Sequence, residues 1–147
     1  MIGVAMAIVA GVLMSIQGVF NTNVTKASSI WVSNSWVQFT GLLVCLSFWL
    51  FTGRQNFTKL FNVDNKFYLL GGVLGAFIVY TVIRSISDLG PCYAVMLILV
   101  AQVSIAYLIE LFGIFNIEKV GFEWTKLIGF ILMVIGIIVF KWETHLR

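Results

Sequence analysis

Five long apolar segments, separated by short polar breaks, dominate the pattern of hydrophobic and polar positions along the chain. Each segment has about 17 to 25 residues, and a helix rising 1.5 Å per residue needs about 20 to cross a hydrocarbon layer about 30 Å thick. Strands of a membrane barrel would instead alternate over segments of about ten residues. The pattern therefore predicts an all-α, polytopic membrane protein, a bundle of five transmembrane helices forming a single transmembrane domain over residues 1–147. The predicted helices are roughly Ile2–Phe20, Trp31–Thr52, Phe67–Ile86, Pro91–Phe112 and Trp124–Phe140.

Composition supports a membrane location. The chain has 147 residues, of which 61% are hydrophobic and only 10% are charged, and its mean hydropathy is +1.04. A soluble domain of this size could not cover so much apolar surface. Tryptophan favours the headgroup layer, and Trp31 with Trp49 and Trp124 with Trp142 bracket the second and fifth segments. The first segment has no basic residue ahead of it and no clear cleavage site, so we expect a retained helix.

The sequence contains no catalytic, metal-binding or cofactor-binding motif. Cys45 and Cys92 have no second thiol or histidine at ligand spacing, so we interpret them as small apolar side chains. His145 stands alone near the end of the chain. There is no phosphate-binding loop or nucleophile motif, and a net charge of +3 does not indicate nucleic acid binding. We therefore expect neither an enzyme, nor a metal or cofactor site, nor a nucleic acid partner.

The distribution of basic residues leaves the orientation in the membrane open. Lys and Arg side chains normally accumulate in cytoplasmic loops, and a clear excess fixes the orientation. Five predicted helices place Arg54, Lys59, Lys66, Lys119 and Lys126 on one side, and Lys26, Arg84, Lys141 and Arg147 on the other. An excess of five over four permits insertion both ways. The alternative is a single orientation set by a weak bias from the 53–66 loop.

Small residues predict where helices pack in lipid, because they allow two backbones to approach closely. The first helix carries a stripe at spacing four and the third helix carries two glycines four apart, so we expect these two helices to pack closely, within a protomer or across an interface. The stripe residues are Gly3, Ala7, Gly11 and Ser15, and the glycines are Gly71 and Gly75. In the fifth helix Gly129 and Gly136 are seven apart, which predicts a dimer or partner interface.

Polar and aromatic side chains within the apolar segments are candidates for substrate binding. Gln17 and Asn21 share one face of the first helix at i and i+4, and Gln102 lies near the middle of the fourth. The aromatic residues Trp36, Tyr80 and Tyr107 also lie inside segments and could offer π faces to a cationic or planar ligand. The alternatives to substrate binding are structural roles. Gln102 could join two helices by hydrogen bonds, and the aromatic side chains could only pack against neighbouring helices.

Glu110 is the candidate for coupling to a proton or cation. An ionisable side chain inside a membrane helix normally faces the bundle interior or an aqueous cavity. Glu110 lies roughly 10 Å from the middle of its segment, so it could instead be an interfacial acid paired with Lys119 or solvated. Arg84 and Asp88 lie at i and i+4, and we interpret them as a solvated ion pair outside the site.

Three motifs resemble the half-size YdcZ-like family of the drug/metabolite transporter superfamily: SIQGVFNTNV (15–24), AQVSIAYLIELFGIF (101–115) and GFILMVIGIIVF (129–140). The second is the most specific, and the third is shared more loosely with small multidrug resistance transporters. The resemblance implies a bacterial inner-membrane transporter built from one copy of a repeat that larger relatives carry twice, with polar positions at Gln17, Asn21, Gln102 and Glu110. The family usually has Asp followed by His where this chain has Glu110 and Leu111, so the chain lacks the partner of a two-residue proton relay.

An odd number of spans suggests how one repeat could work. Two fused copies would form inverted repeats, the arrangement used for alternating access, and a single copy reaches the same geometry by pairing with an oppositely oriented copy. The leading hypothesis is a proton-coupled secondary transporter of a small organic solute or cation, active as an antiparallel homodimer with Gln17, Gln102 and Glu110 of both subunits lining the cavity. The alternative is a non-transporting accessory subunit that needs a paralogous partner. It is suggested by the small number of ionisable groups, since the apolar segments contain a single acid and this acid lies away from the membrane midplane.

Overall fold

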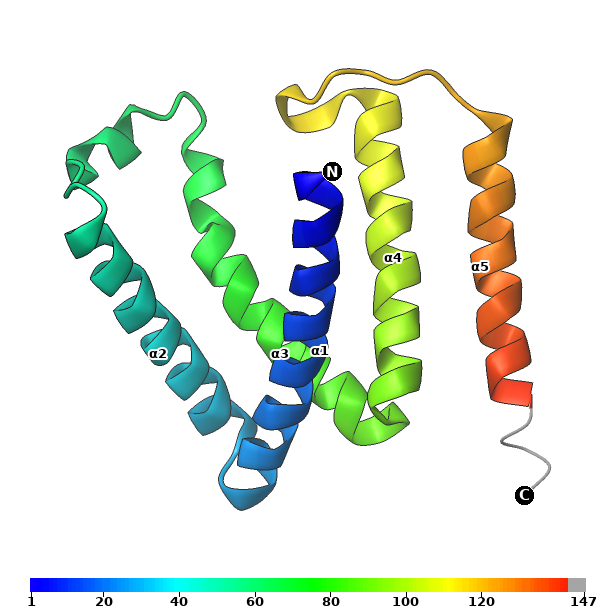
Figure 1. Ribbon diagram of the computed structural model, residues 1–147, viewed down its shortest axis with the longest axis horizontal. Coiled ribbons are helices and arrows are strands. Elements are labelled where there is room, and N and C mark those ends of the chain that lie inside the picture. Colours follow the sequence, from blue (N-terminus) through cyan, green and yellow to red (C-terminus); the bar gives the residue numbers. More distant parts are fainter. Residues whose placement is uncertain (143–147) are drawn as a thin grey trace. The chain divides into compact units, whose positions relative to one another are not determined.

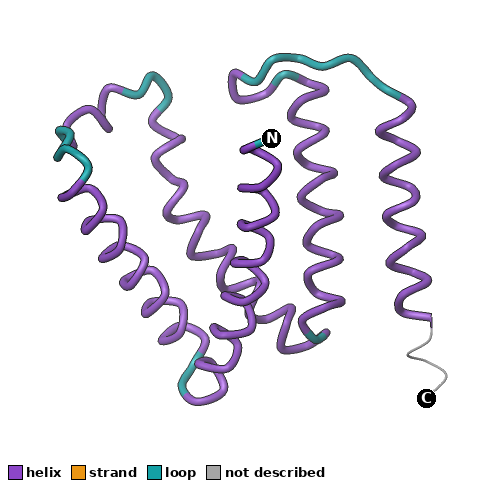
Figure 2. Tube along the Cα trace, viewed as in Figure 1, coloured by secondary structure: helices purple, strands orange, loops and turns teal. Residues whose placement is uncertain are grey.

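The computed structural model of the protein describes residues 1–142 (Figure 1), so His145 and Arg147 lie outside the described residues. Within this range Figure 2 shows helices joined by loops and turns. The long helices are α1 (Ile2–Ala27), α2 (Ile30–Phe51), α3 (Gly71–Leu89), α4 (Pro91–Phe112) and α5 (Trp124–Trp142), and three short 3₁₀ helices are η1 (Phe57–Asn62), η2 (Lys66–Leu70) and η3 (Ile114–Asn116).

The fold class predicted from hydropathy is confirmed. Five helical segments of the described chain are long and apolar enough to cross a membrane. The bounds of α4 coincide with the expected segment, whereas α1 continues to Ala27, seven residues beyond the expected end at Phe20. The additional turns are polar but helical, because the hydroxyl groups of Thr22 and Thr25 donate to the carbonyls of Gly18 and Asn21, each at 2.8 Å. Hydroxyl groups satisfied within their own helix do not interrupt it.

Contacts divide the chain into two compact units, residues 1–88 and residues 89–147. The first contains α1, α2 and α3, and the second contains α4 and α5. Each unit has its own set of polar contacts.

In the first unit the three helices meet near the turn between α1 and α2. The buried residues are Gly18, Asn21 and Thr22 of α1, Ser33 and Asn34 of α2, and Ile83 and Ile86 of α3. A Cβ atom at Gly18 would lie 2.7 Å from Cδ1 of Ile86. Gly18 therefore allows α1 and α3 to approach more closely than any larger residue would.

The small-residue stripe of α1 does not make this contact. A Cβ atom at Gly3, Gly11 or Gly71 would meet nothing within 4 Å in the described structure. The first and third helices do pack together, as expected, but at Gly18 rather than through Gly3, Gly11 or Gly71. A contact of these small residues across an interface stays a prediction. The stripe lies in the N-terminal half of α1, whereas buried polar contacts hold the helices of the first unit together at its C-terminal half.

Two hydrogen bonds from α2 fix the first unit. The Ser33 hydroxyl donates to the carbonyl of Asn21 in α1 at 2.9 Å, and the Asn34 amide Nδ2 donates to the carbonyl of Ala76 in α3 at 2.7 Å. The other amide atom of Asn34, Oδ1, is buried without a partner among residues 1–142. Because neighbouring Ser33 and Asn34 bond to different helices, the start of α2 ties α1 to α3.

In the second unit α4 and α5 form an antiparallel pair. Lys126, near the start of α5, lies beside Glu110 at the end of α4, and Lys141, near the end of α5, lies over the ring of Tyr93 near the start of α4. The chain leaves α4 at Gly113, whose φ of 66° is left-handed and therefore suits glycine. It then folds back, since the Val120 N–H donates to the carbonyl of Glu110 at 3.0 Å. This loop brings the start of α5 to the end of α4.

Candidate functional site

A groove of about 670 Å³ lies along α4 and α5 in the second unit. Most of its lining is apolar, and its charged residues, Glu110 and Lys126, lie at one end, near the loop that joins the helices. The lining comprises Val103, Ser104, Ala106, Tyr107, Leu108, Glu110 and Leu111, followed by Phe122, Lys126, Leu127, Gly129, Phe130 and Met133. Ligand pockets commonly combine a mainly apolar wall with a few polar groups that orient the ligand.

Lys126 is the centre of the polar end. Its Nζ lies 3.8 Å from Oε2 of Glu110 and 3.7 Å from Oε1 of Glu123, and 5.5 Å from the centre of the Tyr107 ring. The Tyr107 hydroxyl in turn accepts the backbone N–H of Glu123 at 3.3 Å. An ammonium group is therefore surrounded by two carboxylates and an aromatic ring.

The two ion pairs of Lys126 are weak. Both N–O distances exceed the usual length of a charge-assisted hydrogen bond, about 2.7–2.9 Å. The side chains of Lys126, Glu110 and Glu123 are 37%, 46% and 51% exposed, and exposed pairs of this kind contribute about 0–1 kcal/mol. Small changes in protonation or ligand binding can therefore separate these groups.

In the alternative in which Glu110 is an interfacial acid paired with Lys119 or solvated, the pairing is wrong, because Lys126 is its partner in the structure. The Glu110 side chain is nevertheless 46% exposed. Helix positions offered a signal that the sequence interpretation missed. Glu110 lies two residues before the end of α4, and Lys126 lies two residues after the start of α5. The 113–123 loop folds back on the end of α4, and so the two antiparallel helices place these residues at the same level.

The other polar candidate of α4 lies outside this groove. Gln102 is exposed and is not among the lining residues. It precedes Tyr107 by five residues, which turns the two side chains about 140° apart around the helix. The structure therefore brings Glu110 together with Tyr107, and leaves Gln102 on a different face of α4.

The candidates on α1 differ in accessibility. Gln17 is exposed, whereas Asn21 is 7% exposed and packs beside Ser33. Their spacing puts them on one side of the helix, but only Gln17 is open to a ligand. Burial of Asn21 follows from the extension of α1, which carries this residue into the contact with α2.

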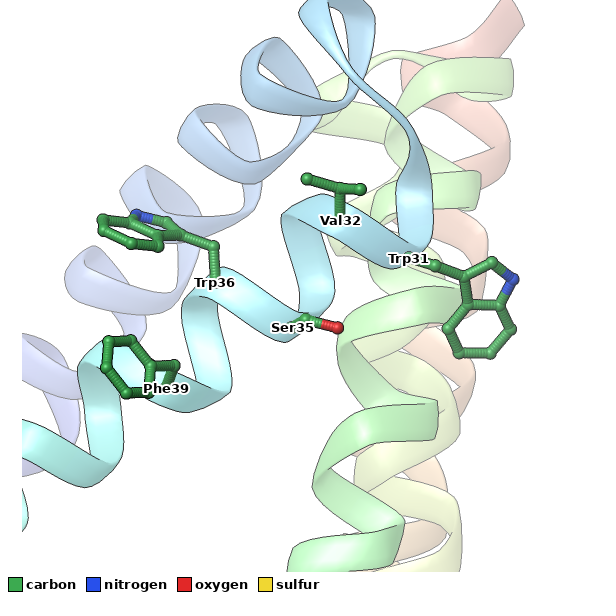
Figure 3. A pocket seen from close by; sticks show the side chains of 5 residues that line it. All are labelled: Trp31, Val32, Ser35, Trp36 and Phe39. Carbon is green, nitrogen blue, oxygen red and sulfur yellow. The ribbon is translucent and has the colours of Figure 1, made fainter.

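The aromatic candidates of the first unit have separate surroundings. Tyr80 of α3 stacks on Trp31, with ring centres 5.0 Å apart. Trp36 belongs to an open depression of about 440 Å³, lined by Trp31, Val32, Ser35, Trp36 and Phe39. Figure 3 shows Trp36 and Phe39 on one side of α2 and Trp31 on the other. Tyr80 therefore joins α3 to α2, and Trp36 faces outward.

A family profile described as "Putative inner membrane exporter, YdcZ" matches residues 2–139. The chain belongs to this family. The match includes α1 to α4 and all but the last three residues of α5. It confirms the family resemblance and makes the chain a transporter of the inner membrane rather than an enzyme. Comparisons with curated proteins and with solved structures gave no match.

The two glycines of α5 in this exporter have no close neighbour in the described structure. A Cβ atom at Gly129 or Gly136 would meet nothing within 4 Å. Gly129 borders the groove, and Gly136 lies seven residues further along, at nearly the same angle around α5. The surface beside Gly136 is free to receive another helix.

Metal binding has no visible basis in the described part of the exporter. Within residues 1–142 no group of three or more His, Cys, Asp or Glu side chains could hold a metal ion. Cys45 and Cys92 are both exposed free thiols.

Proposed function

We propose that this exporter is a proton-coupled secondary transporter of a small organic solute or cation, and that it works by alternating access as an antiparallel dimer. The observation that carries the proposal is the position of Glu110, which lines the groove, is about half exposed and contacts Lys126 only loosely. Such a carboxylate can exchange a proton and change its partner without disrupting the fold.

The two acids within the long helices of the described chain have different surroundings. Asp88 pairs with Arg84 on its own helix at 3.0 Å, and both side chains are more than half exposed. Glu110 instead contacts a residue of another helix. Protonation of Glu110 removes its attraction for Lys126, so proton binding changes the interaction between α4 and α5. This link between charge and helix contact supports Glu110 as the coupling residue.

Dimerisation is supported by the surface of α5 and by the helix count. Gly136 is exposed with open space beside it, and small residues favour helix association in lipid. One five-helix unit paired with an inverted copy has the symmetry of an inverted-repeat transporter. The nearly equal distribution of basic residues permits the two orientations that this pairing needs.

The length of α1 modifies the proposed cavity. Gln17 was expected about 9 Å beyond the middle of its helix, but the midpoint of Ile2–Ala27 lies between residues 14 and 15, so Gln17 is only about 4 Å beyond it. Glu110 is about 13 Å beyond the midpoint of Pro91–Phe112, so the distance of roughly 10 Å expected for the same bounds was too short. We therefore propose Gln17 and Gln102, both exposed, as central walls of a dimer cavity, with Glu110 nearer to its mouth.

Substrate-dependent proton movement in proteoliposomes tests the proposal. Purified exporter is reconstituted with a pH-sensitive dye inside the vesicles, and amines, guanidinium compounds, nucleosides and amino acids are added in turn. We expect at least one class to change the internal pH faster than in protein-free vesicles. Activity that arises only after addition of a paralogous chain would instead favour the accessory-subunit function.

A further inference from the structure

We propose that Glu110, Glu123 and Tyr107 form a binding site for the primary ammonium group of a small amphipathic amine, and that Lys126 occupies this site as a tethered substitute. The proposal rests on the proposed function, because it assigns a substrate class to the groove that contains Glu110. It adds Glu123, which has no role in the proposed coupling, and gives Lys126 a role beyond its contact with Glu110.

The charges at this end of the groove favour a cation. Two carboxylates, Glu110 and Glu123, face the single ammonium group of Lys126, which leaves one negative charge unbalanced in the cluster. The other charged residues of the loop, Glu118 and Lys119, form no ion pair with any residue between 1 and 142. A ligand with one positive charge complements this cluster.

The geometry shows that Lys126 fills the site imperfectly. Its Nζ stays 3.8 and 3.7 Å from the two carboxylates and 5.5 Å from the Tyr107 ring centre. A lysine side chain is held by its backbone on α5, whereas a free amine can move until it donates hydrogen bonds at about 2.7–2.9 Å. The aromatic ring adds a cation–π contact on the same side. A free ammonium group can therefore displace Lys126.

The rest of the groove indicates an apolar substituent on the amine. Val103 lies seven residues before Glu110 along α4, and Met133 lies seven residues after Lys126 along α5. Each interval is about 10 Å along a helix, and the intervening wall is mostly apolar. The charged end lies near the helix termini. An alkyl amine would place its ammonium group at the membrane surface and its chain beside the helices.

Amines that carry an anionic group fit this site less well. The carboxylate of an amino acid, or the phosphate of an aminolipid, would lie close to Glu110 and Glu123 and be repelled. A quaternary ammonium has no N–H group and therefore cannot donate hydrogen bonds to the carboxylates. The favoured ligand is therefore a simple primary alkylammonium in solution.

Equilibrium binding of n-hexylammonium tests the site without requiring transport. The exporter is placed in nanodiscs of phosphatidylcholine and phosphatidylglycerol, and binding is measured by titration calorimetry. Lys126→Met removes the tethered cation and keeps an apolar stem. If Lys126 occupies the site for about 80–90% of the time, its removal should tighten binding about fivefold to tenfold. The control Lys119→Met loses the same charge from the adjoining loop and should bind like the wild type.

A second variant tests the carboxylate while Lys126 remains in place. Glu123→Gln keeps the backbone N–H that bonds to Tyr107, and should weaken n-hexylammonium binding about fivefold or more. Unchanged or weaker binding in a folded Lys126→Met variant, unchanged binding in Glu123→Gln, or equal binding of n-hexanol would each overturn the ammonium site. So would competition by phosphatidylethanolamine in the nanodisc, which would make the groove a lipid site.

The outcome separates this proposal from the proposed function. If proton-coupled transport of another solute depends on Glu110 while Lys126→Met leaves amine binding unchanged, the ammonium site is wrong and the coupling role stands. If n-hexylammonium binds as expected but no solute moves protons, the site stands and the transport proposal fails.

Discussion

Lys126 of α5 reaches across to α4, where its Nζ lies 3.8 Å from Oε2 of Glu110. The same Nζ lies 3.7 Å from Oε1 of Glu123 in the loop before α5. One cation thus connects two helices and their connecting loop through contacts too long to be strong. A change in the charge of Glu110 should therefore alter how α4 and α5 meet, which is the physical basis of the proposed coupling.

Gly136→Leu should weaken the dimer, because it fills the surface where we expect a second helix to pack. The glycine has no neighbour within 4 Å in the protomer, so the variant should fold normally. We expect dimerisation about tenfold weaker, or about 1.4 kcal/mol, in dilution experiments followed by crosslinking and mass measurement in detergent. Gly41→Leu on α2, another exposed glycine without close neighbours, serves as the control. Equal dimerisation of both variants would place the interface elsewhere.

A cysteine in the loop before α3 should be found on both faces of the membrane. Thr58→Cys, in η1, is prepared in a chain whose native Cys45 and Cys92 are replaced by serine. An impermeant thiol reagent should label about half of the molecules from outside and the rest only after permeabilisation, since the small excess of basic residues barely favours one orientation. Labelling from a single face in native membranes would contradict the antiparallel homodimer.

Gly18→Leu should destabilise the first unit. A Cβ atom added there would lie 2.7 Å from Cδ1 of Ile86, and a larger side chain would push α1 away from α3. We expect a loss of about 1–3 kcal/mol and a lower thermal unfolding temperature in detergent. Gly11→Leu changes the same helix where no atom lies within 4 Å, and should have little effect on the protomer. If the two variants unfold alike, the contact at Gly18 is not what holds α1 to α3.

Hydropathy was sufficient to predict the helices, because a segment that crosses lipid must be both long and apolar. It fails where polar residues continue a helix. Thr22 and Thr25 bond to carbonyls one turn earlier, and Asn21 and Thr22 are buried in the first unit. The end of α1 was therefore placed seven residues too early.

The site was less predictable, because its contacts join different segments of the chain. Glu110 and Tyr107 were candidates because they are an ionisable and an aromatic side chain inside an apolar segment. Lys126 and Glu123 join them only because the 113–123 loop turns back toward the end of α4. Trp31 was interpreted as an interfacial residue, whereas it also stacks on Tyr80. A sequence pattern shows which side chains share one face of a helix. It does not show which other residues pack against that face.

The pH dependence of transport by Glu110→Gln most directly tests the central claim that Glu110 couples proton movement to transport. The substitution keeps the size of the side chain and removes its titratable charge. Uptake of a solute identified in the proteoliposome assay is measured at several pH values, with Glu118→Gln in the 113–123 loop as a control that makes the same change. We predict that Glu110→Gln transports independently of pH or not at all, while Glu118→Gln retains the wild-type profile. A wild-type pH profile in folded Glu110→Gln would contradict the account.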